Sequence, residues 1–174
     1  MREEWLRGEG RLVQWAHRNA VDSPIGPRLH QLETAVPYGA ATVLYLLLAW
    51  LALQRLESRG WALRAMLAGV VAWLSSDAVK AIVDRPRPCV HQFVCGSQSF
   101  PEGPGTVLVA LAVAVWPSSR WIALLAAACA LADAAVQLAY GSHWPSDLLG
   151  AWILGGFWGF IVPRLAQRAL PGGE

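Results

Sequence analysis

A run of 21 residues without a charged side chain, residues 34–54, limits what this chain can fold into more than any other feature. As a helix, a run of about 20 apolar residues crosses the roughly 30 Å hydrocarbon core of a bilayer. The composition agrees, because charged residues make up 15% and hydrophobic residues 55% of the 174 residues. A soluble domain has about 25% charged residues. We therefore predict an all-α, polytopic membrane helical bundle, and the length fits one domain.

Further apolar segments, separated by polar connections, complete the predicted bundle. The predicted spans are 36–53, 61–84, 106–116, 121–140 and 147–162, about five transmembrane helices. We expect one membrane-embedded domain over residues 1–174, with an interfacial amphipathic helix and linker at 1–33, the bundle at 34–163 and a cytoplasmic tail at 164–174. In the last span Ala151, Gly155 and Gly159 recur every four residues, which allows a neighbouring helix to approach closely.

The N-terminal segment is polar, with spaced apolar positions and arginines between them. This pattern is typical of a helix that lies in the membrane interface. We expect no cleavable signal, because the segment lacks a short apolar core followed by a small-residue cleavage site.

Arginines also mark one side of the predicted bundle. They are Arg55, Arg59, Arg64, Arg120, Arg164 and Arg168. Cytoplasmic loops carry an excess of basic residues, so this side is predicted to be cytoplasmic. The connections 84–105 and 140–147 then share the extracytoplasmic face. Five spans also place the N-terminal arginines on that face, where attraction to anionic headgroups stabilises an interfacial helix.

Ionisable side chains interrupt two of the predicted spans. Lys80, the only lysine, lies between Asp77 one turn before it and Asp84 one turn after it, and Asp133 interrupts a later span. Such groups are costly in a bilayer unless they are paired or hydrated, so they usually mark a functional interior. The alternative is an Asp77–Lys80 pair that only satisfies itself. We expect Asp133 to face the bundle interior, with Lys80 or Gln137 as its partner.

Two arginines follow Lys80 at the point where its helix is expected to end. Pro86 and Pro88 each remove a backbone donor and push the preceding residue out of helical geometry, so Arg85 and Arg87 lie at the mouth of the helix. A planar guanidinium binds a phosphate through two hydrogen bonds, and a lysine supplies a compact charge deeper in. These three cations are candidate phosphate-binding residues.

A histidine and a carboxylate lie in the stretch 140–147, which closes one apolar segment and opens another. An imidazole needs a partner on its far nitrogen to fix its tautomer before it attacks a substrate, and Asp147 has the spacing to be the partner of His143. Most such pairs at membrane surfaces are not catalytic. Beside Lys80 and the two arginines, however, the pair predicts a site for the phosphate of a lipid.

These motifs resemble those of the type 2 phosphatidic acid phosphatase superfamily, over about residues 12–163. Lys80, six intervening residues and then Arg87-Pro88 match its first motif, and His143 and Asp147 have the spacing of its third. The motif order and helix pattern are similar to small bacterial undecaprenyl-diphosphate phosphatases. The resemblance therefore implies a multi-pass protein of the bacterial inner (cytoplasmic) membrane, in the cell envelope.

The resemblance also implies a mechanism. The histidine matching His143 attacks phosphorus and becomes phosphohistidine, and the aspartate matching Asp147 orients it. The residues matching Lys80 and Arg87 hold phosphate oxygens, and neither a metal nor another cofactor is required. The physical argument agrees, because phosphoryl transfer depends mainly on positioning and charge stabilisation.

Two of the motifs depart from the family's pattern. The second, Pro-Ser-Gly-His in the family, reads Pro101-Glu102-Gly103-Pro104, so the histidine that protonates the leaving group is missing. In the third, Val136-Gln137 replaces Ser-Arg. By position, Gly103 and Gln137 are expected beside the phosphate. We expect Glu102, with a pKa raised by burial, to donate the leaving-group proton; His91 and water are the alternatives.

Three functions follow from these observations. The first is a lipid-phosphate phosphatase with reduced activity that acts on a polyprenyl diphosphate or similar lipid phosphate. The second is a catalytically weak or inactive relative that binds or transports a lipid phosphate. The third is a purely structural membrane protein, which retention of the motif residues disfavours. The net charge of +2 is too small and scattered for nucleic acid, so the expected partners are membrane lipids and the lipid-phosphate substrate.

The three cysteines divide between the outer connection and the membrane. Cys89 and Cys95 lie in the connection and are expected to form a disulfide if that face is oxidising, with two unpaired thiols as the alternative. Cys129 lies mid-span and is expected to be a free buried thiol.

Overall fold

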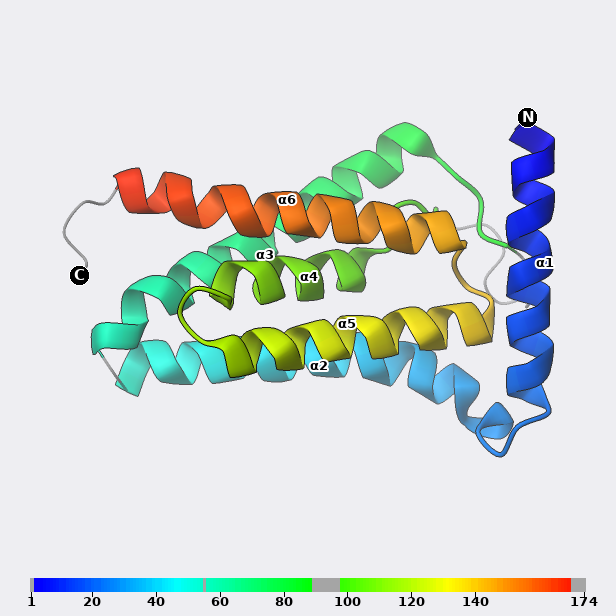
Figure 1. Ribbon diagram of the computed structural model, residues 1–174, viewed down its shortest axis with the longest axis horizontal. Helices are drawn as coiled ribbons and strands as arrows, with labels where there is room; N and C mark the ends of the chain where they lie inside the picture. Colours follow the sequence, from blue (N-terminus) through cyan, green and yellow to red (C-terminus); the bar gives the residue numbers. More distant parts are fainter. Residues whose placement is uncertain (1, 55, 89–97, 170–174) are drawn as a thin grey trace.

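The computed structural model describes residues 2–54, 56–88 and 98–169, and within them the fold is helical (Figure 1). The helices are α1 (Arg2–Val21), the short 3₁₀ helix η1 (Gly26–Arg28), α2 (Leu29–Gln54), α3 (Leu56–Val83), α4 (Gly103–Val115), α5 (Arg120–Tyr140) and α6 (Pro145–Ala169). The β-structure in the described residues is one isolated antiparallel bridge between Pro86 and Gln98. This confirms the predicted all-α bundle.

Helices α2 to α6 run back and forth along one axis, and α1 lies across one end of them (Figure 1). By length and composition, four segments can cross a membrane: Gln31–Gln54, Arg59–Val83, Arg120–Tyr140 and Pro145–Ala169. The third predicted span, residues 106–116, corresponds to a helix too short to cross a membrane. Helix α4 has 13 residues, which at 1.5 Å per residue reach about 20 Å and fall short of a bilayer core.

Helix α4 is the centre of the bundle. It packs against α3, α5 and α6, and nearly all of its residues are buried. A helix that is apolar on every side belongs in an interior. Its Leu108 and Leu111 meet Leu44 and Leu48 of α2 in the main core. Lipid tails are as apolar as leucine, so close packing rather than the hydrophobic effect holds such helices together.

Glycines of α6 allow the closest of these contacts. A Cβ atom added at Gly155 would collide with the carbonyl oxygen of Thr106, and one at Gly159 would collide with that of Ala110. The predicted small-residue stripe on the last span therefore does bring a neighbour close, and that neighbour is α4.

Several helix ends differ from the prediction, because hydropathy marks the apolar part of a helix and not its hydrogen-bonded length. Helix α2 begins at Leu29 instead of residue 36, within the expected linker, and contains Pro37. Helix α6 begins at Pro145, where a proline suits the first turn, and continues past Pro163 to Ala169. Part of the expected tail is therefore helical.

The ends of α3 and α5 and the beginnings of α4 and α6 all lie at one end of the bundle, the end that α1 crosses (Figure 1). The two motif-bearing connections therefore share one face, as predicted. Which side of the membrane this face occupies remains a prediction.

Candidate active site

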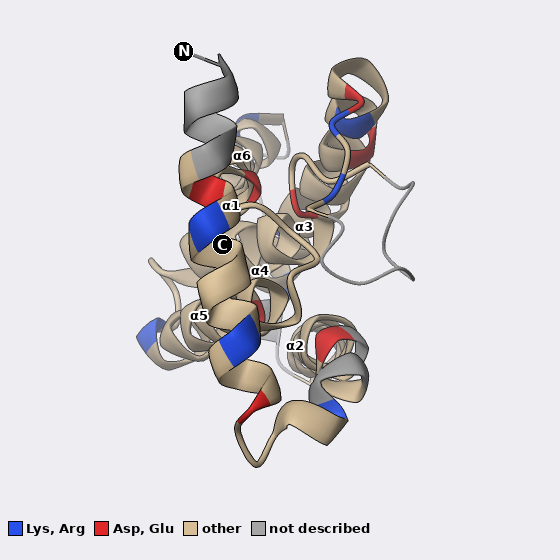
Figure 2. Cartoon of the chain, turned by 90° about the vertical axis from the view of Figure 1, so that its right-hand side faces the viewer, with Lys and Arg blue, Asp and Glu red and all other residues tan. Residues whose placement is uncertain are grey.

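The third-motif residues lie between two helix ends (Figure 2 looks onto this end of the bundle). Helix α5 ends at Tyr140 and is capped by Gly141, which has a left-handed φ of 78° and donates its N–H to the carbonyl oxygen of Gln137 over 3.0 Å. Glycine adopts this conformation without steric cost, so it is the common residue after a helix end. Since α6 begins at Pro145, His143 is fixed in a short, rigid connection.

His143 and Asp147 are brought together, as the sequence predicted. Imidazole Nδ1 lies 3.5 Å from Asp147 Oδ2, and both side chains are buried. Nδ1 has no hydrogen-bond partner in the described chain, and Asp147 is the carboxylate beside it. Burial lowers the pKa of His143 from 6.5 to about 4, although Asp147 raises it in part. The imidazole is therefore neutral at physiological pH, the state that a nucleophile requires.

Two donors hold the Asp147 carboxylate in place. The backbone N–H of Trp144 donates to Oδ2 over 2.8 Å, and Arg85 Nη1 donates to Oδ1 over 2.9 Å. Because each oxygen has its own donor, the carboxylate plane is fixed and Oδ2 faces His143.

Lys80 and Arg87 supply positive charge to the same site. Burial is the largest cause of the lowered pKa of His143. The positive charges of Arg87 and Lys80 lower this pKa further, Arg87 more than Lys80. A Cβ atom at Gly103 would lie 3.0 Å from Lys80 Nζ, so the ammonium lies against the first residue of α4. The Asp77–Lys80 pair is 3.7 Å apart and Asp77 is half exposed, so the pair leaves the ammonium able to bind an anion. Arg87 Nε is buried without a partner in the described residues.

Glu102 replaces the family's serine and is the N-cap of α4. Its Oε2 accepts a hydrogen bond from the Gly105 N–H, and its side chain is buried. The pKa of Glu102 is raised well above its usual value, first by burial and then by the Asp133 carboxylate. A buried carboxyl that holds its proton can donate it, so Glu102 fits the expected acid.

Asp133 faces the bundle interior, as predicted, and Gln137 is its partner. Gln137 Nε2 donates to Asp133 Oδ1 over 3.1 Å, and Ser142 Oγ donates to Gln137 Oε1. Asp133 Oδ2 has no donor in the described chain. The amide of Gln137 is thus used within the protein. Its role as a phosphate ligand stays a prediction.

Arg85 also has other partners than expected. Its guanidinium donates to Asp147, to Ser146 Oγ and to Glu9, and the Trp144 ring lies 5.3 Å from it. In this structure it is therefore not free to bind phosphate. Glu9 and Ser146 were missed from the sequence, because no spacing or motif connects α1 to the start of α6.

No protein-family model matches the chain, and no curated protein matches it. Among solved structures, it is similar to a transmembrane PAP2-type phosphatidylglycerolphosphate phosphatase from Bacillus subtilis. That alignment has a TM-score of 0.66 and 17% identity, and covers 95% of this chain and 87% of the other. LpxE of Aquifex aeolicus aligns with a TM-score of 0.63 and 21% identity, over 88% of this chain and 93% of its own.

The chain has the PAP2-type fold. The motifs predicted this fold, and the two alignments confirm it over nearly the whole chain. At 17% and 21% sequence identity the alignments establish the fold alone, and the chemistry depends on the residues in this chain's site.

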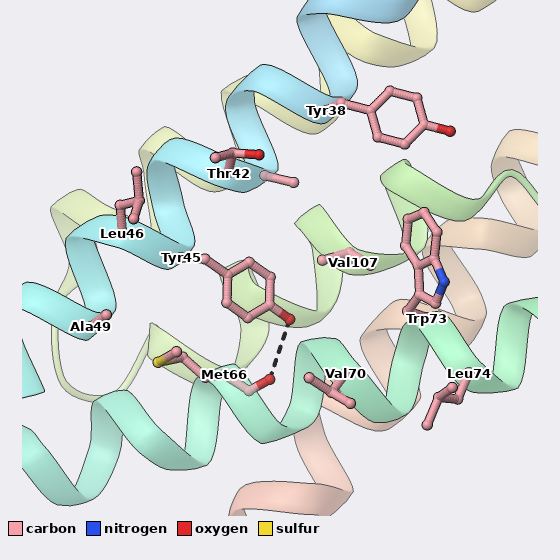
Figure 3. Close-up of a pocket in the computed structure, with 11 residues that line it drawn as sticks. Tyr38, Thr42, Tyr45, Leu46, Ala49, Met66, Val70, Trp73, Leu74 and Val107 are labelled. Atoms are coloured by element: carbon pink, nitrogen blue, oxygen red, sulfur yellow. Dashed lines mark hydrogen bonds between the residues drawn. The ribbon is translucent and has the colours of Figure 1, made fainter.

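The PAP2-type bundle also holds an apolar groove of about 560 Å³ between α2 and α3, with α4 behind it (Figure 3). Its lining residues are Tyr38, Ala41, Thr42, Tyr45, Leu46, Ala49, Met66, Val70, Trp73, Leu74 and Val107. Tyr45 donates its hydroxyl to the Met66 carbonyl oxygen over 3.2 Å, which satisfies the one phenol deep in the groove. Tyr38 and Trp73 lie at the end of the groove nearer the active site, with their ring centroids 6.3 Å apart. Trp73 is one turn of α3 before Asp77.

The remaining predictions concern cysteines and metals. Cys89 and Cys95, with His91, lie outside the described residues, so the disulfide and the alternative acid stay predictions. Cys129 is a free thiol, as expected, but it is partly buried instead of fully buried. Among the described residues, no group of three or more His, Cys, Asp or Glu side chains is arranged to hold a metal ion.

Proposed function

We propose that this protein is an integral-membrane lipid-phosphate phosphatase that works through a phosphohistidine. One observation carries the proposal: His143 is buried, neutral and beside the fixed carboxylate of Asp147, while Lys80 and Arg87 bring positive charge to the same site. A neutral imidazole that faces a positively charged phosphate site is arranged for attack on phosphorus.

The proposed first step forms a bond between His143 Nε2 and the terminal phosphorus, and breaks the bond between that phosphorus and the leaving oxygen. The leaving oxygen is the bridging oxygen of a lipid diphosphate, or the lipid oxygen of a monoester. The Nδ1–H of His143 points to Asp147, which stabilises the charge that develops on the ring. Lys80 and Arg87 bind the phosphate oxygens, and the backbone N–H of Gly103 at the beginning of α4 adds one further donor. Glu102 gives its proton to the leaving oxygen.

In the second step water attacks phosphorus, the N–P bond breaks and the water proton returns to Glu102. The cycle is then closed, with inorganic phosphate and the lipid product released. Glu102 in place of serine, Pro104 in place of histidine and Gln137 in place of arginine support the proposal that activity is reduced. A diphosphate has a better leaving group and needs the acid less, so a polyprenyl diphosphate is our proposed substrate.

The apolar groove supports a lipid substrate over a soluble one. It is lined by side chains of α2, α3 and α4 and leads toward the end where the active site lies. A hydrocarbon chain in this groove places its phosphate near Lys80. The phosphatidylglycerolphosphate phosphatase activity in the name of the similar Bacillus subtilis protein also supports a lipid phosphate as the class of substrate.

We further propose that the protein resides in a bacterial inner membrane with this site on the extracytoplasmic face. The support is the arginine content of the connections at the opposite end of the bundle. We also propose that the single domain has three functional parts. They are residues 1–33, with α1 in the membrane interface, the bundle at 34–163 and the cytoplasmic tail at 164–174.

A weak or inactive relative that binds or transports a lipid phosphate is the second candidate. The observation that favours it is the Glu102 carboxyl at the start of α4, which repels a phosphate whenever it is ionised. Gln137, turned toward Asp133, removes one further phosphate contact.

One assay separates the two candidates. Purified protein is incubated with undecaprenyl diphosphate or phosphatidic acid, and released phosphate is measured beside His143→Ala. Release that depends on His143 supports the phosphatase. Saturable binding of the same lipids without release supports the second candidate and contradicts the first.

A further inference from the structure

The N-terminal helix reaches the candidate active site through Glu9. The Glu9 side chain is only 10% exposed, and its carboxylate lies between Arg85 and the beginning of α6. We propose that Glu9 and Arg85 are positioning residues that hold the Asp147 carboxylate against His143, so that α1 is part of the active site. This inference rests on the proposed function and assigns roles to two residues that the motifs do not specify.

Arg85 bridges the two carboxylates. Its Nη2 donates to Glu9 Oε2 over 2.7 Å, and its Nη1 donates to Asp147 Oδ1 over 2.9 Å. A guanidinium presents its donors in a rigid, planar fork, so fixing one end of the fork also fixes the other. The Trp144 ring beside the guanidinium limits its remaining freedom. The Trp144 N–H fixes Oδ2 of Asp147, and the position of its Oδ1 depends on the guanidinium that Glu9 and Ser146 Oγ hold.

Glu9 is itself held by α6. Its Oε1 accepts a hydrogen bond of 2.9 Å from the backbone N–H of Ser146, which is 137 residues away in the sequence. Ser146 lies in the first turn of α6, where backbone N–H groups lack partners within the helix and negative charge is favourable. One carboxylate from α1 thus ties the segment that follows α3 to the beginning of α6.

These contacts favour positioning over substrate binding for Arg85. Both of its terminal nitrogens are engaged, and its single positive charge faces two carboxylates. Lys80 and Arg87, in contrast, keep donors free of strong partners. Loss of Glu9 would release one end of Arg85, and Asp147 would then be held by one side-chain donor that can rotate.

The first test is a double-mutant cycle with undecaprenyl diphosphate as substrate. Hydrogen bonds to charged groups are strong enough that Glu9→Gln and Arg85→Ala should each lower kcat by about 10-fold to 100-fold. KM should stay within about twofold, because the substrate itself is not contacted. In the Arg85→Ala background, Glu9→Gln should have no further effect, since Glu9 acts through Arg85.

Two variants serve as controls for this cycle. Asp22→Asn removes a carboxylate from the exposed region after α1 and should leave kcat unchanged. Glu9→Asp keeps the charge on a shorter side chain and should recover part of the lost kcat. Two results together would make Glu9 a purely structural residue and overturn the proposal. The first is a kcat of Glu9→Asp as low as that of Glu9→Gln, and the second is a lower unfolding temperature of Glu9→Gln.

The second test reads the histidine directly and needs no turnover. Ring-¹⁵N spectra of histidine-labelled protein identify which nitrogen of His143 carries the proton, with His143→Ala to assign the signal. We expect the Nδ1–H tautomer in the wild type and a mixture in Glu9→Gln. The same tautomer in both proteins, an unchanged kcat in Glu9→Gln, or a raised KM at constant kcat would overturn the proposal. If the wild type releases no phosphate, the proposed phosphatase function fails. The tautomer measurement still decides whether Glu9 and Arg85 position Asp147 against His143.

Discussion

The backbone N–H of Glu102 donates a hydrogen bond to the carbonyl oxygen of Asp147 over 3.3 Å. This contact joins the cap of α4 to the first turn of α6, so the second and third motifs meet through main-chain atoms. A substitution of the Glu102 side chain leaves this bond in place. Glu102→Gln and Glu102→Ser also keep a side-chain oxygen that can cap the Gly105 N–H, so these variants test the chemistry of the site more than its folding.

His143→Ala is expected to abolish phosphate release, because among the described residues His143 is the side chain that matches the nucleophile. Asp147→Asn should lower kcat on the order of 10³-fold to 10⁴-fold, because an amide stabilises the wrong tautomer of the ring. Steady-state kinetics with a lipid diphosphate measure both. Turnover in His143→Ala equal to that of the wild type contradicts the phosphohistidine.

The pH profile should reflect two buried groups. His143 acts in its neutral form, so activity should fall only when the pH drops toward its pKa of about 4. Glu102 acts in its protonated form and its pKa is raised, so activity should fall as the pH rises through that value. Glu102→Gln should remove most activity and flatten the alkaline side of kcat against pH. An unchanged alkaline side assigns the proton donor to another group.

Restoring the family's motifs should raise activity. The triple variant Glu102→Ser, Pro104→His and Gln137→Arg supplies the missing acid and one further phosphate ligand. General acid catalysis is typically worth 10²-fold to 10⁴-fold, so the gain should approach about 10²-fold for a monoester such as phosphatidic acid and be smaller for a diphosphate. A triple variant no faster than the wild type would argue for lipid-phosphate binding as the function.

Filling the apolar groove should affect long-chain substrates selectively. Ala41 and Ala49 line the groove on α2, so Ala49→Trp should raise KM for undecaprenyl diphosphate by about 10-fold or more, since each buried methylene contributes about 0.8 kcal/mol. A short, water-soluble diphosphate should be unaffected. Val43→Trp, on the exposed side of the same helix, is the matched control. Equal losses for both substrates would exclude the groove as the chain site.

The orientation can be tested by cysteine labelling in intact cells. In a variant without native cysteines, Asp22→Cys should react with a membrane-impermeant reagent, because this exposed residue follows the helix that crosses the active-site end. Ser118→Cys, exposed in the turn at the other end, should react only after the membrane is opened. The reverse pattern would place the active site in the cytoplasm.

Local patterns predicted most of the bundle and the core of the site. Long apolar segments predicted the four helices that can cross a membrane. The four-residue spacing of His143 and Asp147 predicted their meeting, because the first turn of α6 brings Asp147 back toward the connection that holds His143. The proline pair after Lys80 also predicted the helix end correctly. Each of these depends on residues that are close in the sequence.

The parts that escaped prediction depend on contacts between distant segments. Glu9 reaches Ser146 across 137 residues, and nothing in either neighbourhood indicates the other. Arg85 and Arg87 each precede a proline, and the motif singles out Arg87 alone. Among the described residues it is Arg85 that contacts Glu9, so the positioning role of Arg85 could not be predicted from the sequence. Likewise, the apolar stretch of α4 reads as a short span, and only its neighbours show that it is a buried helix.

The enclosure of α4 fixes the depth of the chemistry. Because α4 is surrounded by other helices, it does not have to match the hydrocarbon thickness, and any mismatch falls on the four longer helices. Gly103 and Glu102 therefore keep a constant height relative to the protein. Bilayers of different thickness would then present the same lipid headgroup to the site at different heights.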